Sequence, residues 1–283
     1  MRVPEKLLSC VAFIAERVPG VPPTELDYQA TAFFAHIMGA SRWFSHLVTA
    51  KHVAKQLDGR EIAFLANTVE GGITELEMAS DHWFYHPTDQ SADVAVLPCN
   101  HSDNLDVVSI PPENFLTKER MVDLKIGLGD EVFFPGLFTF APGEQRLRPI
   151  LRHGNIAMLP DTAIQVDSGF AEVYLVEARS IGGLSGSPVF VRGTIQIPAP
   201  GLARPPDEAL VAHSSKIWLL GLMHGHWDIN EREMNSVAHA YAGSRGVNMG
   251  ISVVVPVEKI METLDHPDLV ALRAKHDEPQ RSF

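Results

Sequence analysis

The chain reads Gly182-Gly183-Leu184-Ser185-Gly186-Ser187-Pro188, followed by the apolar run Val189-Phe190-Val191. A serine hydroxyl is a useful nucleophile only in a tight turn that exposes it beside backbone N–H groups able to hold a developing oxyanion. Flanking glycines permit such a turn and remove Cβ atoms that would block a substrate. Average residue usage produces the pattern G-x-S-G-x-P at roughly 1 in 50,000 positions. The stretch predicts a nucleophile at Ser185; the alternative is an ordinary glycine–serine turn entering a strand.

Two further stretches supply partners for such a serine. The apolar run that begins at Trp43 ends in Thr49-Ala50-Lys51-His52, which places a possible general base at the end of a rigid element. Asp93 opens the apolar run Val94-Ala95-Val96-Leu97, where a buried carboxylate needs a hydrogen-bond donor such as an imidazole N–H. Asp103 and Asp106 lie in a nearby polar loop and are weaker candidates.

Short apolar runs separated by turn residues predict an all-β fold. The expected strands are residues 11–18, 31–38, 43–50, 61–66, 94–97, 131–140, 171–176, 188–191, 217–223 and 250–255. Helical periodicity is found only at residues 257–264, where Val257, Ile260, Met261 and Leu264 share one face. A boundary is expected within residues 110–125, around Pro111-Pro112, and residues 198–207 and 228–245 are expected to be surface insertions.

Composition excludes several classes of protein. A chain of 283 residues with 45% hydrophobic residues can bury a core, and its formal net charge of −12 disfavours nucleic acid and anionic membranes as partners. No apolar stretch is long enough to cross a bilayer. Cys10 and Cys99 allow one disulfide bond at most, as expected in a reducing compartment. The residues around Arg2 and Lys6 only faintly resemble a signal peptide, so a cytoplasmic location is expected.

The order His52, Asp93, Ser185 resembles that of the chymotrypsin-like (trypsin-like) serine peptidases. Residues 49–52 look like that family's base motif, residues 93–97 like its acid motif and residues 183–188 like its nucleophile motif. Residues 220–225 are similar to the strand that pairs with substrate, and residues 246–264 to the closing strand and C-terminal helix. The resemblance covers most of residues 8–265.

This resemblance implies two antiparallel six-stranded β-barrels with the active site between them and a C-terminal helix. Residues 1–115 would form the N-terminal lobe with His52 and Asp93, and residues 116–283 the C-terminal lobe with Ser185, the helix and a tail. The implied activity is peptide-bond hydrolysis through an acyl-enzyme, with an oxyanion hole formed by the N–H groups of Gly183 and Ser185. No metal or organic cofactor is expected.

The sequence departs from the family pattern at two positions. Val53 stands where a half-cystine usually follows the base, and Leu184 stands where secreted members carry an acid that pairs with a newly cut N-terminus. We therefore expect no zymogen activation. Both features resemble a bacterial intracellular, HtrA-type or glutamyl-endopeptidase-like branch, here without a PDZ-like extension after residue 265.

The expected substrate pocket contains Ser180, His224 and Gly225. Ser180 and His224 resemble the residues that glutamyl endopeptidases place around an acidic P1 side chain, and Arg179 could add positive charge. However, His224 lies one position later than the glutamyl-type histidine, and this offset would turn its side chain to the other face of the strand. The His224-Gly225-His226 stretch has no convincing third and fourth metal ligand.

Two other functions fit the same residues. The chain could be a catalytically silent or partner-gated module that binds peptides, because a triad can be present but misaligned. It could also be an esterase or acyl-transfer enzyme, although Ser187 replaces the second glycine of the G-x-S-x-G elbow. The partners expected are a protein or peptide substrate and a regulatory protein.

Overall fold

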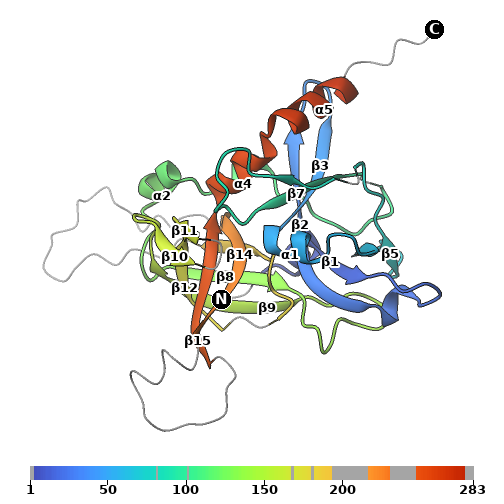
Figure 1. Cartoon of the computed structure of the whole chain (residues 1–283), viewed down its shortest axis with the longest axis horizontal. Helices are drawn as coiled ribbons and strands as arrows, with labels where there is room; N and C mark the ends of the chain where they lie inside the picture. Colours follow the sequence, from blue (N-terminus) through green and yellow to red (C-terminus); the bar gives the residue numbers. More distant parts are fainter. Residues whose placement is uncertain are drawn as a thin grey trace, which may run out of the picture.

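The computed structural model describes residues 3–80, 82–100, 102–166, 169–179, 182–192, 216–229 and 247–277. Its strands form two main groups, an N-terminal sheet coloured blue to teal and a C-terminal barrel coloured green to red (Figure 1). One apolar core lies within the barrel, and a larger one joins the N-terminal sheet to barrel residues such as Phe133 and Phe190, so the two groups lie against each other. This arrangement brings residues from distant parts of the chain together at the boundary between the two groups, which we call the seam.

The N-terminal sheet has seven antiparallel strands in the order β5-β4-β1-β2-β3-β7-β6. They are β1 (Val11–Glu16), β2 (Asp27–Met38), β3 (Trp43–Thr49), β4 (Ile62–Asn67), β5 (Ile73–Glu75), β6 (Phe84–Tyr85) and β7 (Ala95–Cys99). Consecutive residues of β1 and β2 are buried, so both faces of these central strands are covered.

The predicted barrel of the N-terminal lobe is not confirmed. Strand β5 has only three residues, and the segment directly after it, residues 76–80, meets β7 through one isolated bridge, between Met78 and Cys99. The amide of Ala79 donates to the carbonyl of Pro98, but Pro98 has no N–H to return a ladder bond. The sheet therefore curls without a continuous closing ladder.

The C-terminal barrel is closed by six strands, the number that the resemblance implied, in the order β12-β15-β14-β13-β8-β9. They are β8 (Glu131–Gly136), β9 (Ile150–Met158), β12 (Tyr174–Glu177), β13 (Pro188–Arg192), β14 (Ile217–Ile229) and β15 (Val247–Pro256). Strands β10 (Ile164–Val166) and β11 (Gly169–Ala171) form a separate hairpin. The α-helices are α1 (Lys51–Gln56), α2 (Lys118–Leu124), α4 (Val257–Leu264) and α5 (Pro267–Asp277).

The predicted C-terminal helix is α4, with the bounds expected from its periodicity. Val257, Ile260 and Leu264 are fully buried in an apolar core that contains residues of both groups, and the helix contacts β14 and β15 of the barrel as well as β7 of the N-terminal sheet. Helix α5 comes next and was not predicted; the Asp277 carboxylate at its end accepts hydrogen bonds from the β2–β3 turn. No described helix has the length and apolar character that a membrane crossing requires. Cys10 and Cys99 are buried free thiols.

Candidate active site

His52 and Asp93 are brought together by two adjacent strands. Strand β3 ends at Thr49, which pairs with Ala95 of β7, so the first turn of α1 lies beside Asp93, two residues before β7 begins. The His52 ring Nδ1 is 2.8 Å from Asp93 Oδ2, and the His52 backbone N–H donates to Asp93 Oδ1 at 2.8 Å. This amide belongs to the first helical turn, whose N–H groups have no partner within the helix. The carboxylate therefore holds both the ring and the backbone of His52.

A second histidine shares this carboxylate. The Nδ1 atom of His224 contacts the same Oδ2 of Asp93, and the two imidazole rings meet edge to face with centroids 5.1 Å apart. His224 comes from β14, at the point where the β14–β15 register shifts between Met223 and Gly225. The sequence placed His224 and Gly225 on a substrate-pairing strand. The structure directs the His224 ring toward Asp93, and we assign it no acidic-P1 role. Ser180 lies outside the described residues.

The buried carboxylate is held in its ionised form. Asp93 is 3% exposed, and burial alone raises the pKa of a carboxyl group. Hydrogen bonds from His224 and His52 outweigh this effect, so the pKa of Asp93 lies well below its ordinary value. An ionised carboxylate only accepts hydrogen bonds, so both histidine rings carry a proton on Nδ1. Neutral His52 then has a free lone pair on Nε2, as a general base requires.

The turn that carries Ser185 has the backbone shape predicted from its glycines. Gly183 and Gly186 have φ angles of 93° and 86°, in the left-handed region. The Ser185 hydroxyl donates to the backbone carbonyl of His224 at 3.0 Å and, among the described residues, has no hydrogen bond to the His52 ring. The hydroxyl must therefore leave this carbonyl before it can give a proton to an imidazole.

Thr31 of β2 holds this turn from the opposite lobe. Its hydroxyl donates to the Gly183 carbonyl at 2.7 Å, and its backbone N–H donates to the Ser185 carbonyl at 3.1 Å. Thr31 thus binds the carbonyls of Gly183 and Ser185. In the described part of the chain, the N–H groups of these two residues donate to no backbone carbonyl. Sequence analysis missed this role, because a threonine within an apolar strand carries no distinguishing pattern.

Comparison with solved structures identifies the fold of the chain. The protease domain of MamO from Magnetospirillum magneticum, in its apo form, superposes with a TM-score of 0.52 over 91% of this chain and 96% of that domain, at 15% identity. The chain has a trypsin-like protease fold. An inactive mutant form of Rv3671c from M. tuberculosis H37Rv aligns over 96% of this chain and 90% of that one, with a TM-score of 0.46 and 15% identity. No protein-family model and no curated protein sequence matches the chain.

Within this protease fold, Thr31→Val is expected to lower the free energy of unfolding by about 2 kcal/mol or more. The substitution leaves two buried groups without a partner, the Gly183 carbonyl and the Leu137 N–H that donates to the Thr31 hydroxyl at 2.9 Å. Urea denaturation measures the loss. Thr31→Ser keeps the hydroxyl and is the control; equal stability of the valine and serine variants would contradict the role given to this group.

Three side chains of the candidate site could also hold a metal ion. The ligand atoms of His52, Asp93 and His224 all lie within 4.8 Å of one another. Their donor set of two imidazoles and one carboxylate suits a first-row transition metal. In this structure the Nδ1 atoms of both histidines are hydrogen-bonded to the carboxylate, so a metal ion bound through these two atoms would replace those hydrogen bonds.

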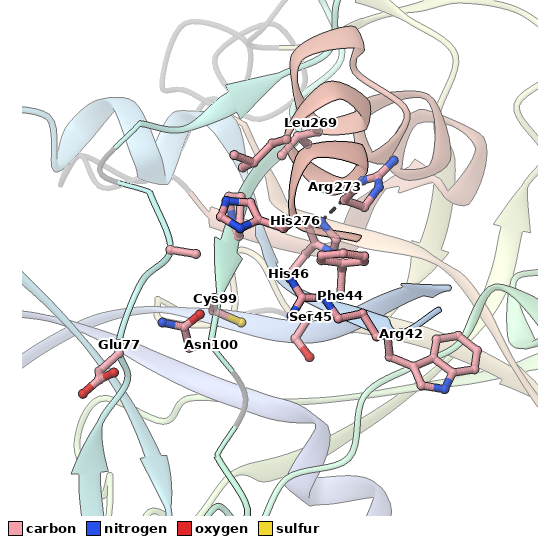
Figure 2. Close-up of a pocket in the computed structure, with 14 residues that line it drawn as sticks. Arg42, Phe44, Ser45, His46, Glu77, Cys99, Asn100, Leu269, Arg273 and His276 are labelled. Carbon is pink, nitrogen blue, oxygen red and sulfur yellow. Dashed lines mark hydrogen bonds between the residues drawn. The ribbon is translucent and has the colours of Figure 1, made fainter. Parts of the chain in front are cut away.

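A separate cavity of about 490 Å³ lies among β3, β7 and α5 (Figure 2). His46 lines it, fully buried, with its ring Nε2 3.4 Å from the Arg273 guanidinium. Burial and the neighbouring Arg273 charge lower the pKa of His46 to about 3, so its ring is neutral near pH 7. None of the residues lining this cavity belongs to the candidate active site.

Proposed function

We propose that the chain is a serine endopeptidase that uses His52, Asp93 and Ser185 as its catalytic triad. The observation that carries the proposal is the double attachment of His52 to ionised Asp93, through ring and backbone, beside the glycine turn of Ser185. A trypsin-like protease fold places such a seam between two lobes, and protein or peptide chains are the proposed substrates.

The proposed reaction begins when Ser185 Oγ attacks a peptide carbonyl carbon. His52 Nε2 takes the hydroxyl proton, and Asp93 stabilises the resulting imidazolium while keeping Nδ1 protonated. His52 then gives the proton to the leaving amine as the C–N bond breaks. Water attacks the acyl-enzyme with His52 again acting as base, which releases the acid product and restores Ser185.

The oxyanion of the tetrahedral intermediate is proposed to bind the N–H groups of Gly183 and Ser185. These donors are fixed before the substrate arrives, because Thr31 holds the carbonyls of the same two residues. Preorganised donors of this kind each stabilise the transition state by about 2.7–4 kcal/mol. Leu184, between them, is fully buried in the barrel core, and we propose that the turn needs no buried ion pair from a cleaved N-terminus.

Labelling with a fluorophosphonate tests the nucleophile. We expect covalent labelling that maps to Ser185 by mass spectrometry and is lost in both Ser185→Ala and His52→Ala. Ser187→Ala is the matched control, since this second hydroxyl of the turn is fully buried and should not matter to labelling. Peptide-library cleavage that disappears in Ser185→Ala then tests the substrate class.

A catalytically silent or partner-gated module is the second candidate function. It is favoured by the hydrogen bond from the Ser185 hydroxyl to the His224 carbonyl, which turns the proton away from His52. Folded wild-type protein that resists fluorophosphonate would overturn the autonomous peptidase and support this second function.

A further inference from the structure

The position of His224 is set by an irregularity of the barrel. Met223 pairs with Val254 and Gly225 with Val253, so His224 is the extra residue of a β-bulge in β14. A bulge redirects a side chain that strict alternation would place elsewhere. Here it directs the His224 ring across the seam to Asp93, which belongs to the other lobe. The position of His224, one residue later than the glutamyl-type histidine, thus coincides with a β-bulge that places its ring in the candidate active site.

The carboxylate of Asp93 receives three hydrogen bonds, and His224 supplies one of them. Oδ1 accepts the His52 backbone N–H, whereas Oδ2 accepts Nδ1–H from both His52 and His224. The side chains of Asp93 and His224 are 4% and 12% exposed, and that of His52 is 32% exposed. The most accessible member is therefore the proposed base, and the two groups that orient it are shielded from water.

His224 also contacts the nucleophile through its main chain. Its carbonyl accepts the Ser185 hydroxyl at 3.0 Å, while the neighbouring Met223 carbonyl accepts the Gly186 N–H at 2.9 Å. One bulged residue thus meets the proposed acid through its ring and the proposed nucleophile through its backbone. The ring fills the side of Asp93 that His52 leaves open.

The surroundings of the ring leave little room for movement. Behind His224 and Asp93 lies a cavity of about 20 Å³, enough for roughly one water molecule. The charged residues on its wall are Asp89, Lys259 and Glu172, and Lys259 pairs with Asp89 at 2.9 Å. With no large space behind it, the His224 ring is confined against Asp93 and the edge of His52.

From this geometry we infer that His224 is a positioning residue, which fixes Asp93 Oδ2 and thereby the orientation of the His52 ring. The inference rests on the proposed function, because it concerns the activation of Ser185. The Nδ1–H group of His224 holds Asp93 Oδ2, the oxygen that also accepts the hydrogen bond from the His52 ring. A residue of similar size without a donor would leave that oxygen held by His52 alone, and a small misplacement of a catalytic group costs about 100-fold in rate.

The test compares His224→Leu, which fills the site without a donor, with His224→Asn, whose amide nitrogen takes about the place of Nδ1. For fluorophosphonate labelling of Ser185, we expect the maximal rate kinact to fall about 10- to 100-fold in the leucine variant, with the binding constant KI unchanged. The asparagine variant should recover most of the rate. If the leucine variant does not fold, His224→Gln, whose amide lies one carbon farther out, takes its place.

A proton NMR signal gives a readout that does not depend on activity. The His52 Nδ1–H proton should resonate far downfield in the wild type and in His224→Asn, and should move upfield or broaden in His224→Leu. A leucine variant with wild-type kinact and an unmoved signal would overturn the inference, as would an asparagine variant that is as slow as the leucine one. Failure of wild-type labelling would instead contradict the proposed function, and the NMR comparison would still decide the role of His224.

Discussion

His52→Ala is expected to lower kcat for a cleaved peptide by about 10⁶-fold. Without the imidazole, no described side chain is placed to take the Ser185 proton, and the Asp93 carboxylate loses the hydrogen bond from the His52 ring. The residual rate would come from the oxyanion donors and from substrate binding alone. Progress curves on a peptide found by library screening measure the effect.

His153→Ala is the matched control for this prediction, because His153 is an exposed histidine of β9 outside the candidate site. It should retain wild-type kcat. Asp93→Asn should fall between the two, with a loss of about 10⁴-fold, since an amide that donates toward His52 favours the wrong tautomer. A His52→Ala loss of less than tenfold would contradict the proposed mechanism.

Gly186→Ala is expected to lower the free energy of unfolding by at least about 3 kcal/mol. A Cβ atom at this position would lie 2.0 Å from the Thr31 carbonyl oxygen and 2.3 Å from the Thr49 hydroxyl oxygen. The glycine also has a φ of 86°, which costs an L-residue about 1–2 kcal/mol even in open space. The seam between the lobes must therefore open to admit one methyl group.

Gly59→Ala separates the two contributions. Gly59 has a φ of 75° and open space where a Cβ would stand, so only the backbone cost of about 1–2 kcal/mol applies. Urea unfolding of both variants measures the difference. Equal losses in the two variants would show that the lobes do not pack at Gly186 as tightly as described.

The candidate site could be predicted only where its chemistry is local. The Ser185 turn could be predicted from its glycines. His52 could be predicted because it follows an apolar run, and Asp93 because it precedes one. Thr31 and His224 act through partners more than 100 residues away. No short-range pattern marks such contacts, and period-two alternation cannot indicate a bulge.

The fold shows the same division. Residues 257–264 were identified because their apolar face repeats with the helical period. Strand β9 was missed, since Arg152, His153 and Asn155 interrupt its apolar pattern where it faces outward. Helix α1 was not predicted, because it follows an apolar run directly and has no capping side chain at Ala50. The N-terminal sheet was wrongly predicted as a closed barrel, because the contact between Met78 and Cys99 is an isolated bridge that no periodicity reveals.

The hold of Thr31 on the serine turn also sets an order of events while the protein is being made. Ribosomes deliver the N-terminal lobe first, so a growing chain carries His52 and Asp93 before Ser185 exists. The carbonyls of Gly183 and Ser185 gain their partner only when the second lobe docks on Thr31. A nascent or truncated chain that lacks this docking has no assembled nucleophile. The proposed peptidase would thus be inactive during synthesis and could not cleave other chains near the ribosome.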